Sequence, residues 1–140
     1  GDEPKAKKLA EYLSKLTVDS DLTALEFADN IKKVLNYGPS SRIHPSTRAF
    51  QALRIAINDE IGELKKLLTW APDSLAPGGR LAIISFHSTE DRCVKKAFQD
   101  LAAGPGFVIL TKKPLVPTAE EEVRNPRSRS SKLRVIEKKG

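Results

Sequence analysis

The fold of this chain depends on one stretch, Ala76-Pro77-Gly78-Gly79-Arg80-Leu81-Ala82-Ile83-Ile84-Ser85-Phe86-His87-Ser88-Thr89-Glu90-Asp91-Arg92. It predicts a helix end, a tight turn, a buried strand over 80–86, a polar loop and the start of another helix. The apolar run has side chains for both faces, which is typical of a central parallel strand. Ligands of open α/β sheets bind beyond the carboxyl ends of strands. Ser85, His87 and Ser88 stand at such an end.

The flanking sequence predicts helices before the strand and a strand pair after the next helix. Apolar residues at helical spacing indicate helices over 2–16 and 21–36, and one long helix from Ser46 or Thr47 to Trp70. Ser20 or Asp21 is the expected N-cap of the second, and Ser88-Thr89-Glu90-Asp91 reads as a capping box.

Two strands are expected after that helix, over 107–110 and 133–136, with a loop over 112–131 between them. They have no crossover helix between them, which predicts an antiparallel pair. The fold class predicted from these elements is α/β.

The charge of the chain is concentrated at one end. The net charge is +6, and the segment 124–140 holds seven basic residues and one acid, so it carries the whole excess. A basic end on a neutral body is the electrostatic pattern expected for contact with a polyanion.

Composition also narrows the class of protein. No run approaches the roughly 20 apolar residues of a membrane span, so no membrane contact is expected. The single Cys93 fits a reducing compartment, and we expect a cytoplasmic protein. His44 and His87 have no ligand partners at metal-site spacing, so no metal site is predicted. The chain has no methionine, which suggests a piece of a longer protein.

Two sets of residues are candidates for binding chemistry. At the strand end, Ser85, Phe86, His87 and Ser88 either terminate the strand and cap the helix, or offer an aromatic face and hydrogen bonds to a base. In 125–132, arginine alternates with serine, which suits phosphate oxygens. A solvated loop is the alternative for the second set.

Several motifs together resemble the bacterial ribosomal RNA small-subunit methyltransferase H family, also called MraW. The segments that carry the resemblance, in order, are His44-Pro45-Ser46-Thr47-Arg48-Ala49-Phe50-Gln51-Ala52-Leu53-Arg54-Ile55, Asn58-Asp59-Glu60, Pro77-Gly78-Gly79-Arg80-Leu81, Ser85-Phe86-His87-Ser88-Thr89-Glu90-Asp91-Arg92, Lys112-Lys113-Pro114 and Asn125-Pro126-Arg127-Ser128-Arg129-Ser130.

The resemblance implies an S-adenosylmethionine-dependent enzyme that methylates N4 of a cytidine in small-subunit (16S) ribosomal RNA. It implies a Rossmann-like methyltransferase sheet with a helical insertion domain, where residues 1–43 belong to the insertion and 44–140 to the C-terminal part of the sheet domain. The family's cofactor loop has no counterpart here, so no cofactor-binding residue is expected in this chain. We therefore expect the isolated chain to be inactive and its partner to be the missing N-terminal half.

The resemblance and the residue chemistry together assign roles. We expect His87 and Ser85 to be catalytic, with His87 a candidate proton acceptor, and Phe86, Ser88 and Arg92 to bind substrate. The residues expected to grip ribosomal RNA, with no DNA expected, are Arg124, Arg127, Arg129 and Lys132. The alternative is a non-catalytic RNA-binding module that uses the basic C-terminal segment.

Overall fold

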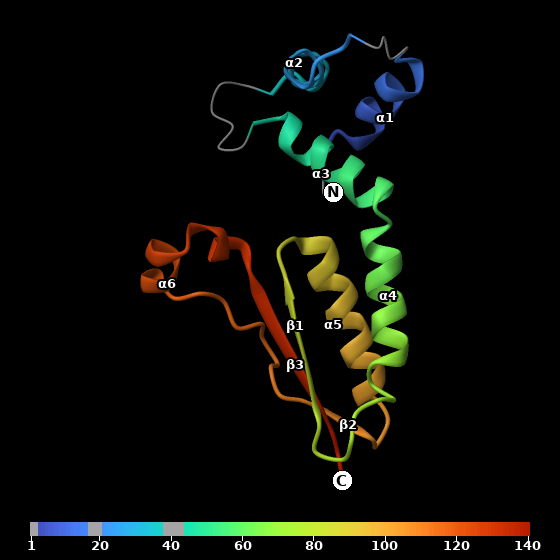
Figure 1. Ribbon diagram of the computed structural model, residues 1–140. Coiled ribbons are helices and arrows are strands. Elements are labelled where there is room, and N and C mark those ends of the chain that lie inside the picture. The colour runs from blue at the N-terminus through green and yellow to red at the C-terminus, as the bar shows by residue number, and fades with distance from the viewer. Residues whose placement is uncertain (1–2, 17–20, 38–43) are drawn as a thin grey trace. The chain divides into compact units, whose positions relative to one another are not determined.

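A computed structural model of the chain describes residues 3–16, 21–37 and 44–140 (Figure 1). The chain divides into two compact units, Gly1–Asn58 and Asp59–Gly140. The resemblance suggests a boundary after residue 43 instead, and the assignment of either unit to a family domain stays a prediction. No helix among the described residues combines the length and apolar character that crossing a membrane requires.

The first unit consists of helices. They are α1 (Ala6–Lys15), α2 (Ala24–Leu35) and α3 (Ser46–Ile57). Their buried core contains Leu9, Ile31, Leu35 and Ala49. Thr23 caps α2 through a capping box with Glu26, so the prediction of Asp21 as the cap is wrong, and Ser20 lies outside the described residues.

The second unit places helices against a small sheet. Its elements are α4 (Glu60–Trp70), β1 (Arg80–Ser85), α5 (Ser88–Ala102), β2 (Phe107–Ile109), α6 (Ala119–Arg124), the 3-10 helix η1 (Pro126–Ser130) and β3 (Lys132–Lys138). The strand order is β1-β3-β2, and both pairings are antiparallel. The predicted antiparallel pairing of the last two strands is thus confirmed.

The core of this unit lies between the sheet and one helical layer. Phe98 and Val94 of α5 pack with Leu68 of α4 against Ile136 of β3, and α4 and α5 lie on the same side of the sheet (Figure 1). Along β1, Leu81 and Ile83 join this core, while the alternate residues point to the other face. The strand register therefore decides which side chains the helices cover.

β1 differs from the predicted central parallel strand. Within the described residues it pairs only with β3, and that pairing is antiparallel. Ile84 remains 57% exposed on the uncovered face. The strand predicted over 80–86 is thus found over 80–85, but the prediction of a central parallel strand is wrong for the strands that the structure describes.

The predicted long helix over 46–70 is wrong, because two helices occupy this segment. α3 ends at Ile57, and Asp59 adopts the left-handed conformation at φ 47° before α4 begins. Asn and Asp tolerate this conformation better than most residues, because their short polar side chains make local hydrogen bonds. The break coincides with the boundary between the two units.

The capping box of α5 begins one residue earlier than predicted. His87 is extended at φ −140° and its ring accepts a hydrogen bond from the Glu90 N–H, while the Glu90 side chain accepts from the His87 N–H. The cap is therefore His87 with Glu90, not Ser88 with Asp91. The loop from β1 to α5 consequently contains only Phe86 and His87.

The segment 112–131 is more ordered than the predicted loop. It contains α6, capped by Thr118 through the Glu121 N–H, and η1, which begins at Pro126. Leu115 also forms an isolated bridge with Leu133 of β3. Local capping and this bridge thus hold the segment next to the sheet.

Candidate nucleic-acid interface

Both predicted binding sets lie at the same end of the sheet. Ser85, the last residue of β1, pairs with Lys132, the first residue of β3. Residues 86–88 follow β1 directly, and η1 leads directly into β3. Antiparallel register therefore places the loop Phe86-His87 and the basic segment, residues 124–132, at one sheet end, although about 40 residues separate them in sequence.

At this end, Ser85 and Phe86 differ sharply in exposure. Ser85 is buried and its hydroxyl donates to the Lys132 carbonyl at 3.4 Å. Phe86 leaves 55% of its surface exposed, while its N–H donates to Glu90 Oε2 at 2.9 Å. The backbone of Phe86 is thus fixed by the Glu90 side chain, and its aromatic ring remains exposed to a partner.

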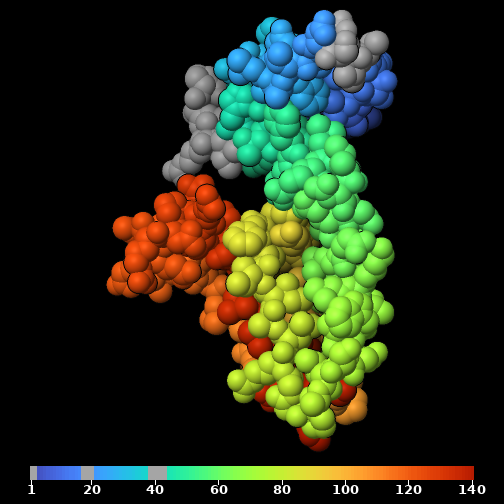
Figure 2. All heavy atoms as spheres, viewed as in Figure 1, coloured from blue at the N-terminus to red at the C-terminus, as the bar shows by residue number. Residues whose placement is uncertain are grey.

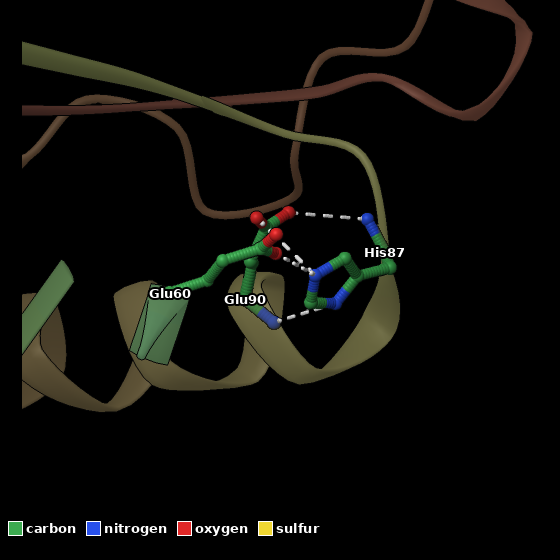
Figure 3. A group of neighbouring side chains, drawn as sticks. All are labelled: Glu60, His87 and Glu90. Atoms are coloured by element: carbon green, nitrogen blue, oxygen red, sulfur yellow. Dashed lines mark hydrogen bonds and ion pairs between the residues drawn. The ribbon is translucent and has the colours of Figure 1, made fainter. Parts of the chain in front are cut away.

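His87 is enclosed by two glutamates. Its side chain is only 9% exposed, and Nδ1 accepts from the Glu90 N–H at 3.3 Å. Nε2 lies 3.2 Å from Glu90 Oε1 and 4.0 Å from Glu60 Oε2. Figure 3 shows both carboxylates directed at the imidazole, one from the start of α4 and one from the first turn of α5. Nδ1 thus caps α5, and Nε2 faces the two carboxylates.

A buried ion pair joins α5 to β3 beside this loop. Arg134 is buried, and it donates to the two carboxylate oxygens of Asp91 through Nε at 2.7 Å and Nη2 at 3.2 Å. Lys132 Nζ lies 3.6 Å from the same carboxylate. The hydrogen bonds from Arg134 are the main cause that holds the pKa of Asp91 below its ordinary value, with Lys132 adding to the effect.

The basic segment presents alternating residues to the protein and to solvent. Ser128 is buried and its hydroxyl donates to the Asn125 carbonyl at 2.8 Å. Arg127 and Arg129, on either side, are exposed. Across the described ranges, no ion pair joins them or Arg124 to a carboxylate. In Figure 2 the segment containing α6 and η1 forms a protruding lobe of this unit. The guanidinium groups are thus available for an anionic partner.

Comparison with known proteins identifies the family. The model of the MraW methylase family matches residues 1–139. The chain belongs to this family. The resemblance found in the sequence is thereby confirmed.

Curated relatives of the MraW family extend well beyond this chain. The ribosomal RNA small subunit methyltransferase H proteins of Rippkaea orientalis and Crocosphaera subtropica are 44% and 48% identical to it, over 99% of its length. The protein of the same name from Rhodopirellula baltica is 61% identical over 71% of this chain. The chain covers 44%, 43% and 31% of these relatives, respectively. More than half of each relative therefore has no counterpart in this sequence.

Two further predicted residues lie in the first turns of α5. Ser88 and Arg92 are both exposed. Arg92 lines a cleft of about 590 Å³ between α4 and α5, together with Thr89 and Cys93. Nothing in these contacts tests the substrate-binding roles predicted for Ser88 and Arg92, which stay predictions.

Three acids beside the loop, Glu60, Glu90 and Asp91, were not among the predicted site residues. Glu90 stands three residues after His87, and that capping-box spacing is a signal that one could have used. Glu60 lies 27 residues before His87, and only the packing of α4 against α5 brings the two together. The sequence pattern predicts only a helix start at Asp91, and its partner Arg134 comes from the third strand.

Substitution of Asp91 by Asn should destabilise the second unit by about 3–5 kcal/mol at pH 7, because Arg134 would remain buried without its counter-charge. The folded-state pKa of Asp91 is lowered, so its contribution is present above the ordinary value of 3.8 and disappears as pH falls through the folded value. The measurement is urea unfolding of the Asp91→Asn variant and of the unsubstituted chain, at pH 7 and below pH 3. The difference in unfolding free energy between them should be large at pH 7 and small at the lower pH.

Asp100→Asn is the matched control, because Asp100 forms an exposed pair with Lys96 on the same helix. It should cost about 0.5 kcal/mol or less. A difference between the Asp91 variant and the unsubstituted chain that stays constant down to pH 3 would contradict this account of the ion pair.

Proposed function

We propose that this chain is part of an S-adenosylmethionine-dependent enzyme that methylates N4 of a cytidine in small-subunit (16S) ribosomal RNA. One observation carries the proposal: the exposed Phe86 ring and the exposed arginines of η1 lie at the same end of the sheet. The name of the family and the printed names of its relatives support the reaction class.

The arrangement suits a base drawn out of an RNA strand. Aromatic faces stack on unpaired bases without needing a particular sequence, whereas guanidinium groups bind the phosphates on either side. We assign stacking to Phe86, and phosphate contacts to Arg124, Arg127 and Arg129. Lys132 would add a weaker contact, because Asp91 already lies 3.6 Å from its Nζ.

We propose that the polar groups at this sheet end serve the protein itself rather than the cofactor. The Ser85 hydroxyl is bound to the Lys132 carbonyl, and the His87 ring is occupied in capping α5. These polar groups are engaged within the protein, and S-adenosylmethionine would supply the methyl group from a site made mainly by the missing part of the enzyme.

The sheet is suited to pairing with that missing part. β1 has one strand neighbour among the described residues, and Ile84 and Val108 are exposed at 57% and 37%. Ala82 and Ile84 alternate with the core residues of β1, so they lie on the face that α4 and α5 leave uncovered. We propose that further strands and helices complete a Rossmann-like sheet here, with the C-terminal part supplied by this unit.

His87 and Ser85 have contacts that favour positioning the loop. To accept a proton from the cytosine amine through Nδ1, His87 would first have to release the Glu90 N–H. Its predicted role as a proton acceptor stays a prediction. His87→Asn keeps a good capping residue and removes the imidazole, so the substitution separates capping from proton transfer.

Joining this chain to the unmatched part of the Crocosphaera subtropica relative tests the function directly. The chimera, incubated with methyl-labelled S-adenosylmethionine and small-subunit RNA, should yield N4-methylcytidine on nucleoside analysis. Each part alone, as a control, should yield none. A folded chimera that binds RNA without incorporating label would favour the alternative, a non-catalytic RNA-binding module.

Replacing both Arg127 and Arg129 by Ala should weaken RNA binding and flatten its salt dependence. Each lost phosphate contact lowers the slope of log K against log salt by about 0.7–0.9, so the double variant should lose roughly one to two units. Arg80→Ala is the control, because Arg80 stands at the other end of β1 and pairs with Glu137 at 2.7 Å. Equal slopes for the double variant and the unsubstituted chain would show that η1 makes no phosphate contact.

A further inference from the structure

The cluster of Glu60, His87 and Glu90 contains three ligand atoms of the kinds that bind transition metals. One atom from each residue lies within 4.8 Å of the other two. The Nε2–oxygen separations of 3.2 and 4.0 Å bracket the spacing of about 3.4 Å between ligands of a tetrahedral ion with bonds of about 2.1 Å. Small side-chain rotations would therefore bring all three atoms to bonding distance.

Among the residues that the structure describes, none forms a hydrogen bond with the imidazole nitrogen at the centre of this cluster. His87 Nε2 is fully buried and makes no hydrogen bond, although Glu90 Oε1 lies 3.2 Å away. A buried polar atom without a partner is costly, and it requires an explanation. A cation between the imidazole and the carboxylates would satisfy it.

The Glu90 carboxylate is already oriented for such an ion. Oε2 accepts from the N–H groups of Phe86 and His87 at 2.9 and 3.4 Å, which leaves Oε1 on the side of Nε2. Hydrogen bonds to a ligand's second oxygen are the usual way in which proteins hold metal-binding carboxylates in place. The Glu60 and Glu90 side chains are 22% and 23% exposed, so an ion can reach the cluster from solvent.

We propose that Glu60, His87 and Glu90 form a binding site for a divalent first-row transition ion such as Zn²⁺. One imidazole and two carboxylates suit zinc better than magnesium, which prefers oxygen ligands alone. The ion would fasten the start of α4 to the loop that carries Phe86. This site does not depend on methyl transfer.

Binding has a consequence for the cap of α5. A neutral imidazole that gives the Nε2 lone pair to a metal carries its proton on Nδ1. That nitrogen could then no longer accept from the Glu90 N–H, whose present contact is a long 3.3 Å. Metal binding therefore exchanges this hydrogen bond for coordination, and the change of tautomer is a specific signature of the site.

The test is a Zn²⁺ titration of the 140-residue chain with ¹⁵N-labelled histidine, in a Cys93→Ser background that removes the free thiol. The expected result is saturable binding of one ion, with the His87 ring signals moving to the Nδ1-protonated form. His44 is the internal control, because it lies in the other unit and contacts Ser46. Its signals should not move.

Glu60→Gln should lower the affinity for Zn²⁺ at least about tenfold, because a charged ligand is lost. Glu63→Gln, one turn along the same helix, should leave the affinity unchanged, since Glu63 is exposed and pairs with Lys66. His87→Asn, which retains a capping side chain, should abolish the site even if the Glu60 variant folds poorly. Absence of saturable binding at Zn²⁺ concentrations up to about 1 mM, where the binding free energy would be only about −4 kcal/mol, or equal affinity in the Glu60 and Glu63 variants, would overturn the proposal.

Discussion

The ion pair between Asp91 and Arg134 fixes the geometry on which the candidate interface depends. It connects the first turn of α5 to the middle of β3, and β3 in turn is paired with β1. Because only Phe86 and His87 separate β1 from α5, the ends of this short loop cannot move independently. Arg134 is buried, so the loss of Asp91 would leave its guanidinium in the interior without a counter-charge.

The capping box adds a local constraint to this long-range one. Glu90 binds the backbone of both loop residues, and its own N–H is bound by the His87 ring. The loop is thus held from the helix side by hydrogen bonds and from the sheet side by the register of β1. What remains exposed is the Phe86 ring, next to the arginines of η1 across the sheet end. Because the loop is already held in place, little of the protein's own conformational freedom would be lost when a partner stacked on this ring.

The sequence predicts those parts of the fold that depend on local patterns. The strand predicted over 80–86, which the structure shows over 80–85, follows from an apolar run, and the antiparallel pairing of the last two strands follows from the absence of a crossover helix. The break at Asp59 was not predicted, because the apolar spacing continues through it and a left-handed residue leaves little trace in composition. The cap was placed at Ser88 because serine is a far commoner N-cap than histidine. Glu60 was missed because only packing brings it near the loop.

The central claim is that Phe86 and the η1 arginines contact the same stretch of ribosomal RNA. The most direct measurement is photo-crosslinking to small-subunit RNA in the chimeric enzyme, with a photoreactive phenylalanine analogue placed at residue 86 in one sample and at residue 129 in another. The account predicts crosslinks from both positions to nucleotides that neighbour one another in the RNA. Crosslinks to unrelated regions, or none from residue 86, would contradict it.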